Sequence, residues 1–144
     1  ISLDYWRLEG GIDYEAWSLT GGVETLGGNG RVGFSTPLAT LHAFQGEADA
    51  FLTTPPQVVA DRYAKLGYQP DFSALGAPRK LNLVATYHDF GAAHGTGTLG
   101  HEMDFGAIIR IDDHWRLDPA YAAYDGTTGF ASRNKIWLSL TFSY

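Results

Sequence analysis

Hydrophobic and polar residues alternate along most of the chain, and the alternation is clearest at its C-terminus. There, large apolar or aromatic side chains occupy every second position, namely Ile136, Leu138, Leu140, Phe142 and Tyr144. The intervening positions are small and hydroxylic apart from Trp137. Because successive side chains of a β-strand point to opposite faces, this pattern predicts a strand with one apolar and one polar face.

The same period of two recurs upstream and predicts an all-β protein. Together with the C-terminal segment it indicates about seven antiparallel strands, near residues 3–14, 16–26, 61–69, 80–90, 101–112, 115–125 and 136–144. No segment has a convincing apolar stripe at helical period, although residues 36–52 are compatible with a short helix. Pro119 lies inside the sixth strand and lacks a backbone N–H, so we expect a β-bulge or a break of register there.

The connections between the predicted strands alternate in length. Tight or moderate links lie near 15–16, 70–79 and 112–114, and longer links rich in Gly, Thr, Ser and Pro lie at 27–60, 91–100 and 126–132. Short turns at one rim and long loops at the other are typical of outer-membrane β-barrels. In this interpretation the long links are extracellular, and the segment 27–60 is the longest of these loops.

Aromatic residues on the predicted apolar face form two groups. The group near the rim of short turns contains Tyr14, Trp17, Tyr68, Trp115, Phe142 and Tyr144, and the group near the opposite rim contains Trp6, Tyr87 and Tyr121. Aliphatic residues and glycine lie between the groups. Two aromatic girdles around an aliphatic band are expected of a membrane barrel, whereas a soluble sandwich concentrates aromatic residues in its core. The pattern therefore favours an antiparallel, up-and-down transmembrane β-barrel.

Composition narrows the possible functions further. The chain has 144 residues, the size of one domain, and carries 10 basic against 16 acidic residues for a net charge of -6. This balance argues against a nucleic-acid partner, which requires clustered Lys and Arg. Because the chain has no cysteine, it has no disulfide framework, thiolate metal site or cysteine nucleophile.

Several segments resemble a known family. They are residues 36–56 (TPLATLHAFQGEADAFLTTPP), 61–68 (DRYAKLGY), 81–90 (LNLVATYHDF) and 101–110 (HEMDFGAIIR), followed by a closing strand that ends in an aromatic residue. In this order, and from roughly residue 17 to the C-terminus, the chain resembles the bacterial alginate-export family of outer-membrane β-barrels.

The resemblance implies an integral protein of the Gram-negative outer membrane, in contact with its lipid and lipopolysaccharide. It implies a channel through which hydrophilic solutes, or an anionic polysaccharide such as alginate, pass by diffusion without a cofactor. Family members are much longer, so we expect residues 1–144 to be the C-terminal part of one barrel domain. Missing N-terminal strands or a partner chain would close the barrel, because open sheet edges are not tolerated in lipid.

The predicted polar face supplies candidate pore-lining residues, since charged side chains along a lumen set ion selectivity. They are Arg7, Glu9, Asp13, Glu24, Lys65, His88, Glu102, Asp104, Arg110, Arg116 and Asp118. Acidic residues outnumber basic ones in this set, which does not favour selection of a polyanion. The structural alternative is a ladder of salt bridges, in which Glu102 or Asp104 pairs with Arg116, and Arg110 pairs with Asp118.

The alternating residues Ile136, Leu138, Leu140, Phe142 and Tyr144 also resemble the signal that the outer-membrane assembly machinery recognises. We therefore expect that machinery to be a partner of the chain.

Catalytic and metal-binding patterns are not evident. His42, His88, His94, His101 and His114 lack the i, i+2 or i, i+4 spacing of metal ligands, and no G-x-S-x-G motif is present. We therefore expect a protein that is not an enzyme. Two other interpretations stay open: a soluble β-sandwich or barrel that binds carbohydrate or lipid, and a structural or assembly component of the outer membrane without transport.

Overall fold

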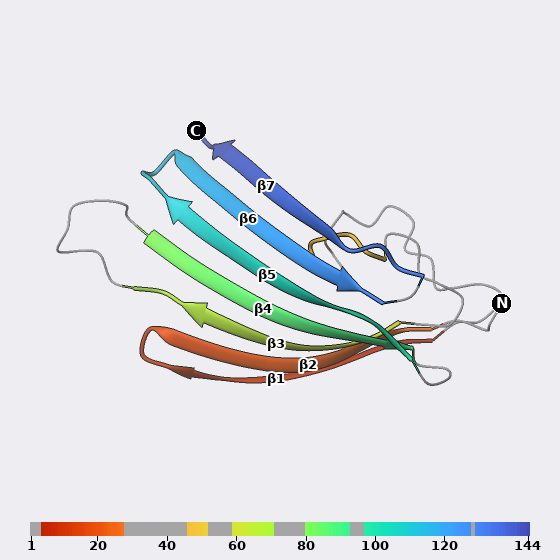
Figure 1. The fold of residues 1–144 in the computed structure, drawn as a ribbon. Coiled ribbons are helices and arrows are strands. Elements are labelled where there is room, and N and C mark those ends of the chain that lie inside the picture. The colour runs from red at the N-terminus through yellow and green to blue at the C-terminus, as the bar shows by residue number, and fades with distance from the viewer. Residues whose placement is uncertain (1–3, 28–45, 52–58, 71–79, 93–96, 128) are drawn as a thin grey trace.

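The computed structural model describes residues 4–27, 46–51, 59–70, 80–92, 97–127 and 129–144. Seven strands form one antiparallel sheet in which each strand pairs with its neighbours in sequence (Figure 1). They are β1 (Tyr5–Tyr14), β2 (Trp17–Leu26), β3 (Val59–Tyr68), β4 (Lys80–Ala92), β5 (Thr98–Arg110), β6 (Trp115–Gly126) and β7 (Arg133–Phe142). The prediction of an all-β, up-and-down antiparallel sheet is thereby confirmed.

Helical structure is absent from the described parts of the chain. Of the short helix expected over 36–52, residues 46–51 form turns, and the other positions lie outside the described residues. No helix in the described ranges has the length and hydrophobicity needed to cross a membrane.

Two of the predicted tight connections are tight in the structure. Glu15 and Ala16 alone separate β1 from β2, and Glu15 adopts a φ of 52°. Between β5 and β6, Oδ1 of Asp112 accepts hydrogen bonds of 2.8 Å from the backbone N–H groups of both His114 and Trp115. An aspartate that bonds the backbone two or three residues ahead stabilises a turn, which explains the short link.

Pro119 is accommodated without the β-bulge or register break expected from the sequence. Gly106 pairs with Ala120 and Ile109 with Leu117, so β5 and β6 keep one register on both sides of the proline. The pairing of β6 with β7 is continuous through Pro119. The expectation is wrong because the residue without an N–H interrupts the ladder only on the β5 side of the strand.

The two faces of the sheet differ in character. On the apolar face, Leu8, Ile12, Ile136 and Leu138 are 69–79% exposed. The polar face carries the ionisable residues predicted from the alternation. Its loop end is covered by segment 46–51, drawn in gold in Figure 1. The buried apolar cluster consists of Ala48, Phe51, Val59, Phe90, Leu99, Ala122 and Tyr124, so the core lies between the sheet and this segment.

Candidate functional site

Segment 46–51 is anchored to the polar face of the sheet by an aromatic side chain. The ring of Phe51 makes edge-on contacts with Phe90 of β4 and Tyr124 of β6, at centroid distances of 4.9 and 5.7 Å. The Tyr124 hydroxyl donates a 2.6 Å hydrogen bond to the carbonyl oxygen of Leu99. Burial of these three aromatic rings stabilises the contact between the segment and the sheet.

Two carboxylates of β5 hold the backbone of the segment. The N–H of Ala48 donates to Oε1 of Glu102 at 2.7 Å, and the N–H of Glu47 donates to Oδ2 of Asp104 at 3.2 Å. Gly46 has a φ of 86°, and a Cβ atom there would lie 2.4 Å from Oε1 of Glu102. Only glycine combines this backbone conformation with this close approach, so the contact depends on Gly46.

His88 of β4 lies between two buried carboxylates, those of Asp61 and Asp104. Its Nδ1 atom is 2.8 Å from Oδ2 of Asp61, and its Nε2 atom is 3.4 Å from Oδ2 of Asp104. Ionised carboxylates only accept hydrogen bonds, so both ring nitrogens donate and the imidazole carries a positive charge. The ring also stacks on Phe90, with an interplanar angle of 9°. His88 is therefore a buried counter-ion that joins β3, β4 and β5.

β7 holds the segment from the other side. The ammonium group of Lys135 pairs with the carboxylate of Asp49, and the Arg133 guanidinium donates to the carbonyl oxygen of Asp49 at 3.1 Å. The indole N–H of Trp137 donates to the carbonyl oxygen of Glu47 at 3.2 Å. Acidic side chains of β5 and basic side chains of β7 thus hold one short segment across the sheet.

Two carboxylate oxygens in this cluster have no donor in the described structure. They are Oε2 of Glu102 and Oδ1 of Asp104, and both side chains are more than nine-tenths buried. Leaving a buried acceptor without a donor costs about 1–3 kcal/mol. The cluster therefore has more buried acceptors than donors, and His88 supplies two of the donors that are present.

A second polar group lies on β1 and β3. The guanidinium of Arg7 pairs with the carboxylate of Glu9 and donates from Nε to the Tyr63 hydroxyl at 3.0 Å. The Tyr63 hydroxyl also donates to Glu9. A Cβ atom at Gly22 would lie 2.5 Å from the Tyr63 ring, so glycine leaves the space that this ring occupies.

All the predicted pore-lining residues alternate onto the polar face, but their exposure differs. The buried ones are Glu24, His88, Glu102 and Asp104; the half-buried one is Asp118; the exposed ones are Arg7, Glu9, Asp13, Lys65, Arg110 and Arg116. The structure gathers only the buried residues into one cluster with segment 46–51.

The salt bridge considered between Arg116 and Glu102 or Asp104 is wrong. The register places Arg116 directly opposite Arg110, far along the strand from Glu102 and Asp104. Arg116 instead donates from Nε to Oδ1 of Asp118 at 2.7 Å within its own strand. The register is the cause, because it places Arg110 opposite Arg116 near the tight turn and leaves Glu102 and Asp104 towards the other end of β5.

Sequence reasoning missed five residues of the cluster. They are Asp49, Asp61, Arg133, Lys135 and Trp137. Period-two alternation placed Trp137 on the polar face, and its extension to Asp61 and Lys135 could have found them. Asp49 lies in a turn without periodicity and could not be placed from the pattern.

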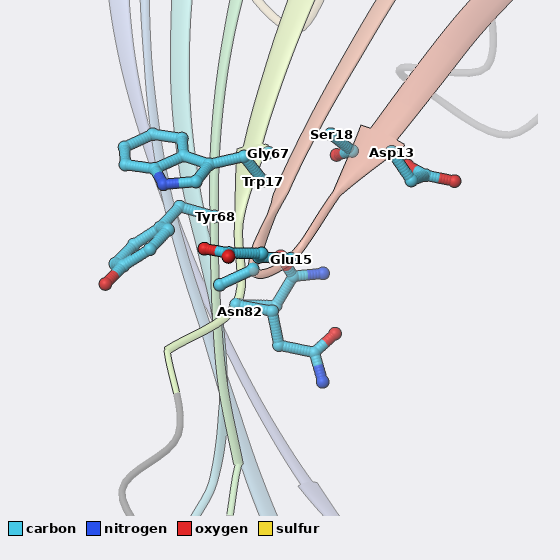
Figure 2. A pocket seen from close by; sticks show the side chains of 9 residues that line it. Asp13, Glu15, Trp17, Ser18, Gly67, Tyr68 and Asn82 are labelled. Carbon is cyan, nitrogen blue, oxygen red and sulfur yellow. The ribbon is translucent and has the colours of Figure 1, made fainter.

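A pocket of about 480 Å³ lies at the opposite rim, next to the turn between β1 and β2 (Figure 2). The rings of Trp17 and Tyr68 lie together on one side of it, 4.3 Å apart, while Asp13 and Ser18 lie on the other. The register aligns Tyr14, Trp17 and Tyr68 across β1, β2 and β3. This row coincides with one of the aromatic groups predicted from the sequence.

No three His, Asp or Glu side chains within the described ranges are arranged to hold a metal ion. His42 and His94 lie outside those ranges. Compared with known proteins, the chain matches no family model, no curated protein and no solved structure.

Proposed function

We propose that the chain forms part of the wall of an outer-membrane β-barrel channel. In this proposal the apolar face contacts lipid and the polar face borders a water-filled lumen. Exposed apolar surface on this scale marks contact with a membrane or another protein. The distribution of ionisable residues on the apolar face favours a membrane over another protein as the surface that this face contacts.

Those ionisable residues form a single row across four strands. Arg62 lies opposite Asp89, Asp89 opposite His101, and His101 opposite Asp125. Asp89 is 3.7 Å from Arg62 and 3.2 Å from Nδ1 of His101. Between this row and the rim of tight turns, the strand positions on the apolar face carry no Asp, Glu, Lys, Arg or His. A charge-free band bounded by a polar row is the pattern required of a surface that crosses a bilayer.

The height of the charge-free band fits a membrane. The ten-residue interval from His101 to Ile111 covers about 33 Å along a strand. At a strand tilt of about 40° this corresponds to a height of about 25 Å, the usual height of the apolar band of a barrel. The Tyr87 hydroxyl lies 3.1 Å from Nδ1 of His101, next to the polar row, as expected of an aromatic residue at the headgroup level.

Closure of the barrel needs further strands. Because the antiparallel strands are seven in number, β1 and β7 run in the same direction and cannot form an antiparallel pair with each other. We therefore infer that additional N-terminal strands or a partner chain complete the wall, placed by the outer-membrane assembly machinery. Bacterial barrels use an even strand number, which an odd number of added strands provides.

The solutes that fit this lumen are hydrophilic. The resemblance to the alginate-export family points to an anionic polysaccharide such as alginate, but the strand positions of the polar face carry seven Asp or Glu against seven Lys or Arg. Equal numbers of the two signs do not select for either an anion or a cation, so we propose passive diffusion of hydrophilic solutes along this part of the wall. Segment 46–51 narrows the lumen at the loop end.

The test combines extraction and electrical recording of the intact protein. A channel requires detergent for extraction and gives stepwise conductance after reconstitution into a planar bilayer. A soluble carbohydrate- or lipid-binding protein stays in solution without detergent. A structural or assembly component requires detergent but gives no conductance, and either of these last two outcomes would overturn the proposal.

A further inference from the structure

We propose that His88 is the charge of a pH-dependent latch that holds segment 46–51 against the sheet. When His88 is protonated the segment is held, and when the ring loses its proton the segment is released. The latch rests on the contacts around His88 and does not depend on the proposed channel function.

His88 is surrounded by acidic groups. The titratable groups that face it are Glu24 on β2, Asp61 and Tyr63 on β3, and Glu102 and Asp104 on β5. Of the basic side chains at this end of the polar face, Arg133 and Lys135 are engaged with Asp49, and Arg7 is engaged with Glu9 and Tyr63. The imidazolium is thus the positive charge at the centre of a group of carboxylates, and its loss leaves them to repel one another in a buried site.

The connection between His88 and the segment runs through one atom. Oδ2 of Asp104 accepts both from Nε2 of His88 and from the backbone N–H of Glu47. Glu102, two residues away on the same face of β5, accepts from the N–H of Ala48. Oε2 of Glu102 and Oδ1 of Asp104 have no other donor in the described structure, so the cluster depends on the donors that His88 supplies.

When His88 loses its proton, segment 46–51 moves and the sheet stays in place. β4 is held by continuous ladders to both β3 and β5. Polar contact between the segment and β5, by contrast, consists of the two backbone hydrogen bonds to Glu102 and Asp104. Lifting the segment breaks its contacts with β7 and with the Phe51 cluster but breaks no ladder, and it lets water reach the carboxylates, which relieves their repulsion.

Amide hydrogen exchange on the intact protein tests the latch. Exchange is measured by mass spectrometry at pH 6 and pH 10, and each rate is divided by the intrinsic chemical rate at that pH. We expect the protection of the Glu47 and Ala48 amides to fall by about tenfold or more at pH 10. Amides of residues 81–87 in β4 serve as the internal reference and keep their protection.

Variants separate the role of His88 from a general effect of pH. His88→Gln keeps a side-chain donor but no titratable charge, so the Glu47 and Ala48 amides are weakly protected at both pH values. His101→Gln, on the apolar face, keeps the wild-type pH dependence. Equal protection at pH 6 and pH 10 in the wild type would overturn the proposal, as would an undiminished pH effect in His88→Gln. If His88→Gln fails to fold, the wild-type and His101→Gln measurements decide.

Discussion

Nδ1 of His88 on β4 lies 2.8 Å from Oδ2 of Asp61 on β3, although the two residues are not directly opposite each other. The register places Tyr63 opposite His88 and Phe90 opposite Asp61, so the pair is diagonal. Phe90 stacks on the imidazole and also contacts Phe51 of the covering segment. The ion pair is thereby shielded from water by the residues that form the apolar core.

Removal of the His88 ring should destabilise the protein strongly. His88→Ala leaves Asp61 and Asp104 without their buried counter-ion, and breaking such a pair costs about 3–5 kcal/mol in the free energy of unfolding. His101→Ala is the matched control, because its pair with Asp89 is exposed and contributes about 1 kcal/mol or less. Denaturant titration of both variants measures the difference, and equal losses would contradict the buried role of His88.

A charge on the apolar face should oppose insertion into lipid. Leu138→Arg places a cation at mid-strand in the charge-free band, at a cost of about 2–4 kcal/mol. Ser139→Arg places the same charge one residue further along β7, on the polar face, and should change stability by less than about 1 kcal/mol. The measurement is reversible unfolding in lipid vesicles. A larger loss for Ser139→Arg than for Leu138→Arg would reverse the assignment of the faces.

Gly46→Ala should displace segment 46–51 from the sheet. The substitution adds backbone strain of about 1–2 kcal/mol and also a clash with Glu102. Gly129→Ala is the control, since Gly129 also has a positive φ but a Cβ atom there meets no neighbour within 4 Å. Exchange of the Glu47 and Ala48 amides should accelerate only in Gly46→Ala, and unchanged exchange would show that the contact with Glu102 is not needed.

Charge reversal at the polar face should change ion selectivity. Arg110 and Arg116 lie opposite each other on exposed positions, so replacing both with Glu concentrates negative charge along the lumen. The reversal potential in a salt gradient should shift towards cation selectivity. Arg62→Glu, on the apolar face, should leave the reversal potential unchanged. An identical shift in both proteins would count against a lumen bordered by the polar face.

The period of two in the sequence was sufficient to predict the sheet. Alternation fixes which side chains share a face, and the tight links at 15–16 and 112–114 fix the order of neighbouring strands, so the seven antiparallel strands could be predicted. The register between neighbouring strands could not be predicted from this alternation. The salt bridges expected for Glu102 and Arg116 failed because the pattern does not say which residues lie opposite each other.

The candidate site could be predicted only in part, for a related physical reason. His88, Glu102 and Asp104 follow from the alternation, but their burial depends on a segment far away in sequence. Residues 46–51 have no periodicity, and their backbone N–H groups carry no signal in the sequence. Contacts made by main-chain atoms, such as that of Ala48 with Glu102, become visible only when the fold brings the segment to the sheet.

The orientation of the two faces is tested most directly by accessibility along β7 in lipid. The chain has no cysteine, so single cysteines at residues 136 and 138–141 can each carry a nitroxide spin label. In vesicles, labels at Ile136, Leu138 and Leu140 should collide with molecular oxygen, which dissolves in lipid. Labels at Ser139 and Thr141, which are exposed on the polar face, should instead respond to a water-soluble nickel complex. Equal access of the nickel complex to both sets, or its exclusion from the second set alone, would contradict a wall with lipid on its apolar side.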